Sequence, residues 1–265
     1  MAKASLLLFL LAFAIPAAQA SDTVFLEELT WTELHDLIQS GKTTIIVPIG
    51  GTEQNGPHMA LGKHNFRVRF LSEKIARALG NALVAPVIAY VPEGGFEPPT
   101  GHMRFPGTIT APEDAFEKVL EYAARSFKLA EFHDIVFLGD HGSYQKAEKL
   151  VADRLDKEWA AKPVRVHAIE EYYWASEAEF GRLLRSKGYR EEEVGTHAGL
   201  ADTSLTLAVD PRLVRADRLQ PGAKLESGDG TNGDPRRSSA ELGQLGVDLI
   251  VTRTVDAVRK ATGQR

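Results

Sequence analysis

The sequence predicts an α/β fold of three layers, in which a mainly parallel sheet lies between two layers of helices. Short apolar runs rich in β-branched residues alternate along the chain with longer segments of helical spacing, and this alternation is typical of a parallel sheet covered on both faces. The chain has 265 residues, of which 43% are hydrophobic and 25% charged, so it is long enough for one sizeable core. It shows no internal repeat and no linker, and we expect one domain.

The strands are expected where short apolar runs end in turn residues. The first is the run TIIVP, which stops at Gly50 and Gly51, and the third is DIVFL, which stops at Gly139. The four expected strands are residues 44–48, 82–88, 134–138 and 164–168.

The helices are expected from apolar residues at helical spacing. Phe66, Phe70, Ile75 and Leu79 fall on one face of a helix, and Pro112 suits the first turn of another. The expected helices are residues 66–79, about 112–132, 144–159, 175–186, 202–208 and 238–258. In such a fold ligands bind beyond the carboxyl ends of the strands, where the polar turns after Pro48 and Leu138 both lie.

The first twenty residues have the pattern of a signal peptide. Lys3 gives a basic start, residues 6–15 are apolar, and Ala18-Gln19-Ala20 is a cleavage signal before Ser21. We therefore expect export to the periplasm or the medium, with residues 21–265 forming the mature domain. The alternative is an uncleaved anchor or a buried helix. No other stretch is long and apolar enough to cross a bilayer, so we expect no membrane contact after cleavage.

Charge and cysteine content narrow the possible partners and ligands. The chain has 31 basic and 36 acidic side chains and no basic run, so nucleic acid is not an expected partner. It has no cysteine, so any metal ligands must be histidine or carboxylate.

Candidate ligands follow the first and third strands. Glu53, His58 and His64 lie in a segment rich in glycine and proline, where irregular backbone can bring such groups together around zinc, manganese or iron. Alone this segment could equally be a polar surface loop. His141, in the turn after the third strand, is expected at the same edge of the sheet as Glu53, which makes a site there plausible.

Two further histidines are weaker candidates. His197 could be a proton shuttle or a ligand, although His197 and Asp202 could also simply begin a helix. His102 is expected to line the pocket. Ser143 and Ser204 lie outside a Gly-x-Ser-x-Gly elbow, which argues against a serine hydrolase.

Five ordered blocks resemble the creatininase family, whose first block reads Glu-Gln-His-Gly-Pro-His and closes with Gly-Thr-Asp. Here residues 48–58 read PIGGTEQNGPH and residues 61–64 read LGKH. The other blocks are FPGTI at 105–109, His141-Gly142, HAG at 197–199 with DTS at 202–204, and GDP at 233–235 with SAELG at 239–243. Together they span about residues 45–243.

This resemblance implies a creatininase-like three-layer fold, an oligomer, and two divalent ions that activate water for hydrolysis of a C–N bond. The first ion would be bound by Glu53, His64 and His141. The second would use positions 55, 64 and 143, where this chain has Asn55, His64 and Ser143. Since a neutral imidazole has one lone pair and cannot easily bridge two ions, we expect one ion, zinc, with manganese or iron possible.

The resemblance also implies roles around the ion. His197 would protonate the leaving nitrogen, and Asp140, Asp202 or His58 would act as a base or orient other groups. Tyr173 and Trp174 lie where family members place aromatic residues that cover the substrate, and His58 and His102 would line the pocket.

The resulting hypothesis is a secreted, homo-oligomeric, metal-dependent amidohydrolase that cleaves a small linear or cyclic amide. One alternative is a member of the same family that trims a peptide. Another is a non-catalytic periplasmic protein that binds a metal or ligand. Creatinine itself is not the expected substrate, because the metal-binding positions depart from the family's pattern.

Overall fold

The computed structural model describes residues 22–220 and 228–263. Within them four parallel strands form a sheet in the order β2-β1-β3-β4. The strands are β1 (Thr44–Ile49), β2 (Ala82–Val84), β3 (Asp134–Gly139) and β4 (Arg165–Ala168). The predicted signal peptide, residues 1–20, lies outside the described residues.

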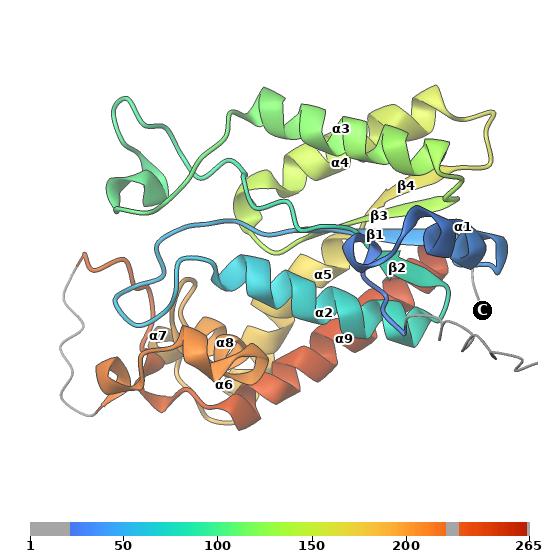
Figure 1. Cartoon of the computed structure of the whole chain (residues 1–265). Helices are drawn as coiled ribbons and strands as arrows, with labels where there is room; N and C mark the ends of the chain where they lie inside the picture. The colour runs from blue at the N-terminus through green and yellow to red at the C-terminus, as the bar shows by residue number, and fades with distance from the viewer. Residues whose placement is uncertain (1–21, 221–227, 264–265) are drawn as a thin grey trace, which may run out of the picture.

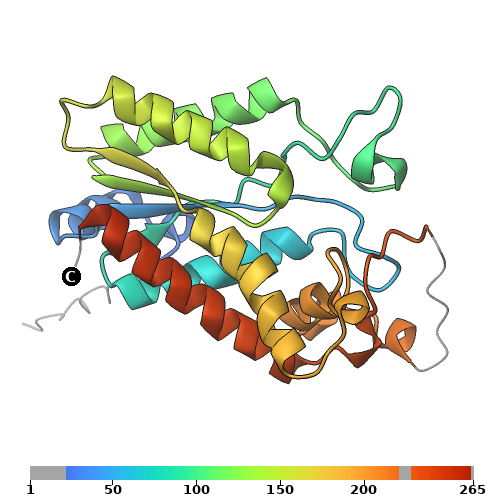
Figure 2. The same cartoon turned by 180° about the vertical axis from the view of Figure 1, so that it is seen from behind.

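Helices cover both faces of the sheet (Figures 1 and 2). The helices α3 (Glu113–Leu129) and α4 (Gln145–Glu158) lie over one face, with α1 (Trp31–Gln39) beside them. The other face carries α2 (Lys63–Leu79), α5 (Glu170–Trp174), α8 (Leu200–Val209) and α9 (Ala240–Thr262). A π-helical turn, Ala175–Glu179, joins α5 to α6 (Phe180–Ser186), and α7 spans Glu191–Val194.

The core divides into two apolar clusters because strand side chains alternate between the faces. Ile45 and Val47 of β1 pack into the cluster beneath α3 and α4, whereas Ile46 packs into the cluster beneath α2 and α9. All six residues of β1 are buried, which fits a central strand covered on both sides. The predicted three-layer α/β fold is confirmed.

Several boundaries differ from the sequence prediction. The strand expected at 82–88 ends at Val84, because Pro86 lacks the amide hydrogen that a continuing ladder requires. Further along, Ile88 pairs with Ile49 as an isolated bridge. α2 begins at Lys63, three residues before its first predicted apolar position, and this earlier start places His64 in its first turn. α1 was not predicted.

None of the helices in the described ranges is both long enough and apolar enough to cross a membrane.

Candidate metal centre

Strand order explains why distant residues meet at one edge of the sheet. β1 and β3 are neighbours and end in register, with Ile49 paired to Gly139. The segment after β1 carries Glu53 and runs into α2, and the turn after β3 carries His141. Both therefore emerge at the carboxyl edge, where α/β folds bind ligands.

Glu53 lies at the centre of the predicted ligand group. Its carboxylate is fully buried; Oε1 lies 2.8 Å from Nε2 of His64, and Oε2 lies 3.3 Å from Nε2 of His141. One potential ligand atom from each of these three residues lies within 4.8 Å of the others. The structure thus brings together the three residues that were predicted as ligands of the first ion.

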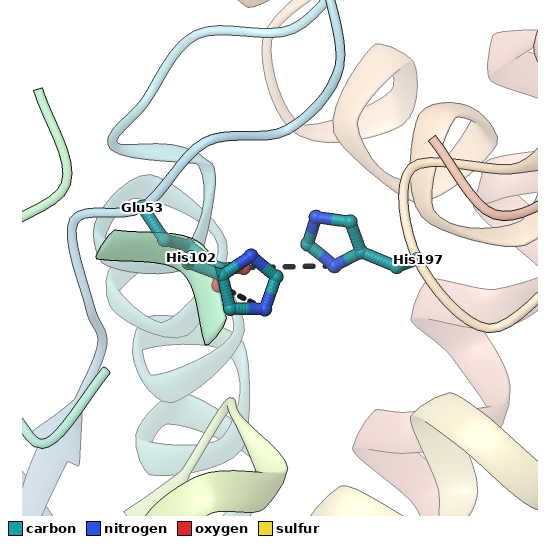
Figure 3. Close-up of side chains that lie close together, drawn as sticks. All are labelled: Glu53, His102 and His197. Atoms are coloured by element: carbon teal, nitrogen blue, oxygen red, sulfur yellow. Dashed lines mark ion pairs between the residues drawn. The ribbon is translucent and has the colours of Figure 1, made fainter. Parts of the chain in front are cut away.

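Two more imidazoles, those of His102 and His197, approach the same carboxylate (Figure 3). Nε2 of His102 lies 3.1 Å from Oε2 of Glu53, and Nδ1 of His197 lies 3.8 Å from Oε1. Gln54 holds the outer edges of both rings: its Nε2 is 3.0 Å from Nδ1 of His102, and its backbone oxygen is 3.0 Å from Nε2 of His197. Glu53, His102 and His197 form a second group with metal-binding spacing.

The residues present fit a divalent cation. The buried Oε2 of Glu53 faces two imidazole nitrogens, Nε2 of His102 at 3.1 Å and Nε2 of His141 at 3.3 Å, and a carboxylate with imidazoles around it is a donor set that zinc prefers. His64 contacts Glu53 through Nε2, and its Nδ1 lies 2.6 Å from Oδ2 of Asp140. A metal-binding histidine typically has a carboxylate on its other nitrogen, which fixes the ring and its tautomer.

Electrostatics favour an ionised carboxylate. Burial alone would raise the pKa of Glu53, but hydrogen bonds with His141 and His64 outweigh it and hold that pKa well below its usual range. Burial would lower the pKa of His141, but its bond to Glu53 raises it.

His197 is electrically neutral at neutral pH. Burial, aided by the positive charge of Lys63, lowers its pKa to about 3. The ring can therefore accept a proton or offer a lone pair, and it must take up a proton before it can give one to a leaving group.

A buried ion-pair network supports the metal centre. Lys63 and Arg67, both on α2, each lie 2.7 Å from an oxygen of Asp202. Arg67 Nε is also 2.7 Å from Asp140, whose other oxygen accepts a hydrogen bond from Tyr172 at 2.6 Å. Asp140 and Asp202 are thus tied to cations and orient the site. The roles of Lys63 and Arg67 were not predicted from the sequence. Two cations four residues apart lie on the same face of a helix, and the rest of that face of α2 is buried, which could have indicated that they are buried too.

The residues at the family's second metal position are used for other contacts. Asn55 donates from Nδ2 to the backbone oxygens of Glu53 and Ala60, at 2.9 and 3.1 Å. Ser143 donates to the backbone oxygen of Pro92 at 2.6 Å. These side chains stabilise loops around the site.

The remaining candidates are placed around this centre. His58 is buried and pairs with Thr203 at 3.0 Å, away from Glu53. Tyr173 lies against the turn that carries His141. A Cβ atom at Gly142, in that turn, would collide with the hydroxyl of Tyr173. Trp174 is 57% exposed.

A cavity of about 590 Å³ adjoins the histidine pair of Figure 3. Its walls include His102, Arg104, Phe105, His197 and Asn232. Within the described part of the chain, neither Tyr173 nor Trp174 belongs to these walls.

Glu93 also lies at the site and was missed. It is 3% exposed, and its Oε2 lies 3.7 Å from Nδ1 of His141. Burial and the nearby charge of Glu53 raise the pKa of Glu93 to about 8, although His141 opposes the shift. An acid in the loop after the strand predicted at 82–88, at the same edge of the sheet, was the signal that could have identified it.

A protein family and several characterised relatives match this chain. The family model described as creatinine amidohydrolase matches residues 27–258. The chain is 25% identical to a creatinine amidohydrolase of Pseudomonas putida, over 91% of this chain and 98% of that one. It is also 25% identical to a mycofactocin precursor peptide peptidase of Mycolicibacterium smegmatis, over 87% of this chain and 89% of the relative.

Solved structures show the same fold. A mutant creatininase described as of the Zn-Zn type aligns with a TM-score of 0.75 at 24% identity, covering 91% of this chain and 99% of the other. The matched blocks include the loops that carry Glu53 and His141, so the family assignment covers the candidate centre as well as the sheet. The chain belongs to the creatininase family.

Proposed function

We propose that this creatininase-family protein is a metal-dependent amidohydrolase that cleaves the C–N bond of a small linear or cyclic amide. The observation that supports this most is the convergence of His64 and His141 on the buried carboxylate of Glu53. Two histidines, one carboxylate and an open position form a recognised catalytic zinc arrangement.

We propose one zinc ion per chain, bound by Glu53, His64 and His141, with manganese or iron as substitutes. When bound, such an ion supplies Lewis acidity toward the substrate carbonyl and lowers the pKa of water toward ~7. Glu53 would contribute one negative charge to the two groups that share it, which is too little to balance two divalent ions. A measured content of two ions would mean that His102 and His197 bind the second.

Side chains of this protein would orient the ligands and transfer protons. Asp140 holds Nδ1 of His64 and is itself held by Arg67 and Tyr172. Asp202 accepts the backbone N–H of Ala198 at 2.9 Å and so fixes the residue next to His197. Neutral His197 takes a proton during attack of water and returns it to the leaving nitrogen.

The cavity beside His102 and His197 supports a small substrate. Its volume, about 590 Å³, lies within the usual range for small-molecule sites. Peptide trimming is the second candidate, since a relative in the same family is a peptidase for the mycofactocin precursor peptide.

We also propose that the protein is exported and forms a homo-oligomer. The signal pattern of residues 1–20 supports a mature protein that begins at Ser21 and acts in the periplasm or the medium. Intact mass of the exported protein tests this, and a retained Met1 would contradict it. Family membership supports a homo-oligomer, which light scattering at micromolar concentration tests; a monomer mass would contradict it.

Elemental analysis of the purified protein, followed by a screen of small amides and short peptides, tests the function. We expect one zinc per chain and turnover of an amide. Cleavage of peptides alone would favour the peptidase. Retention of a ligand without turnover, or no metal in protein offered zinc and manganese, would favour a non-catalytic binding protein.

A further inference from the structure

Glu93 is a buried carboxylate beside the proposed ligands, and nothing in the family's pattern assigns it a role. We propose that Glu93 belongs to the metal centre, as the carboxylate that lies beside the Nδ1 edge of His141 and adds the second negative charge that a divalent ion requires. This inference rests on the proposed function, because it concerns the same ion.

The ring of His141 lies between two carboxylates. Its Nε2 edge faces Oε2 of Glu53 at 3.3 Å, and its Nδ1 edge faces Oε2 of Glu93 at 3.7 Å. If Nε2 binds the ion, Nδ1 must carry the proton, and a carboxylate on that side strengthens the ligand and fixes its tautomer. The direct partner of Nδ1 is Ser143, whose Oγ lies at 2.8 Å and whose backbone N–H donates at 3.2 Å, so Glu93 would act on the ring by its charge rather than through a hydrogen bond.

The environment of Glu93 indicates an unmet need for a positive partner. Across the residues that the structure describes, neither of its carboxylate oxygens has a hydrogen-bond partner, although the side chain is 3% exposed. Burying an unpaired carboxylate is costly, so such a group calls for a cation or a proton nearby.

Local sequence makes room for this acid. A side chain at Gly51 would place its Cβ 2.6 Å from Oε1 of Glu93, so glycine is needed there for Glu93 to reach the site. Ser143, at the position of the family's missing acid, donates to the backbone oxygen of Pro92 and lies 2.8 Å from Nδ1 of His141. Ser143 therefore holds the segment next to Glu93 against the ring of His141. The acid beside this ring comes from that segment rather than from position 143, where the family has it.

Charge balance around the site points to the same conclusion. Among the buried described residues here, the two charges of Lys63 and Arg67 balance those of Asp140 and Asp202, and Lys63 also lies 4.0 Å from Oε1 of Glu53. Glu53 and Glu93 remain, with two negative charges when both are ionised. That total matches one divalent ion when the bound histidines are neutral.

The test is zinc affinity of the full-length protein, measured without substrate by competition with a chromophoric chelator. We expect Glu93→Gln to weaken zinc binding by roughly 10–100-fold, the usual effect of removing a group that orients a ligand. The matched control is Glu148→Gln, which alters another buried carboxyl with an unpaired oxygen; it lies on α4 beside Gly139 and, in the described part of the chain, makes no ion pair with a proposed ligand. We expect it to bind zinc as the wild type does.

Two further measurements separate this role from a merely structural one. In chelator, Glu93→Gln should melt no lower than the wild type, because it removes a carboxyl that lies unpaired beside Glu53, while its stabilisation by added zinc should shrink. Adding Ser143→Glu to Glu93→Gln should recover part of the affinity by restoring the acid at the family's position.

Wild-type affinity in Glu93→Gln, an equal loss in Glu148→Gln, or a lower melting temperature in chelator would overturn the inference. Its failure is distinguishable from failure of the proposed function. If zinc binds the wild type and the Gln variant equally, only the role of Glu93 is wrong; if Glu93→Gln loses affinity but no amide is turned over, only the hydrolysis is wrong. A wild type that binds no zinc would refute both.

Discussion

Two pairs of histidines meet at Glu53 and are built differently: His64 and His141 form what we call its buried side, and His102 and His197 its open side. On one side His64 is held by Asp140, which is paired with Arg67, and every member of that chain of contacts is buried. On the other side His102 and His197 are partly exposed, contact Gln54 and border a cavity. If the ion binds as proposed, the first side would fix it and the second would meet the substrate, with the carboxylate of Glu53 shared by both.

Removal of a ligand on the buried side should have the largest effect. His64→Ala or His141→Ala is expected to abolish both metal retention and hydrolysis, because each leaves Glu53 with one histidine of the proposed group. Elemental analysis after dialysis, together with an amide assay, checks this. Asn55→Ala is the control and should keep its metal; full metal content in His64→Ala would show that the ion binds elsewhere.

On the open side, His197→Ala should retain the metal but slow turnover by roughly 10²–10⁴-fold, the range for loss of a proton-transfer group. Metal content and kcat are measured on the same sample. Loss of the ion in this variant would instead assign His197 to a metal and would erase the distinction between the two sides.

The support behind the buried side can be broken without touching a proposed ligand. Arg67→Gln leaves Asp140 and Asp202 short of a cation, and removing one partner of a buried ion pair typically costs about 3–5 kcal/mol. Urea unfolding in chelator measures the free energy of unfolding. A loss below about 1 kcal/mol would show that the network contributes little to the fold.

Acid should produce the smallest effect. Burial would raise the pKa of Asp202, but Lys63 and Arg67 hold it well below its usual value. Because the folded-state pKa is depressed, this contribution to stability is present above an unfolded pKa of about 3.9 and is lost as the pH falls below it. The contribution of Asp202 to the free energy of unfolding, measured in chelator, should not change with pH near neutral pH and should fall below about pH 4. Asp202→Asn, which lacks the titrating group, should show a weaker loss in that range.

Much of the fold was predictable because the spacing of apolar residues and the succession of strands along the chain are set by local or nearly local sequence. The run at 44–48 and the turn after Leu138 were enough to place Glu53 and His141 at one edge, and the structure brings them together. The early end of β2 at Val84 could have been anticipated from Pro86, and the start of α1 from the capping box that Thr30 and Glu33 form.

The supporting residues of the site were harder to predict. Lys63 and Arg67 look like ordinary surface cations in a helix, and only the packing of α2 against α8 buries them beside Asp202. Glu93 sits in a loop whose path depends on contacts with Gly51 and Ser143, about forty to fifty positions away in sequence. Such roles arise from tertiary contacts that residue spacing does not encode.

Gln54 has a consequence for how this enzyme's substrate range can change. Its side-chain amide nitrogen lies 3.0 Å from His102, 3.1 Å from His197 and 3.0 Å from the backbone oxygen of Gly230. Three loops that border the cavity are therefore linked through a single amide, next in sequence to the carboxylate that both metal-binding groups share. We therefore expect a change in one of these loops to disturb the other two, so that acquiring a new substrate would require concerted replacements rather than independent single steps.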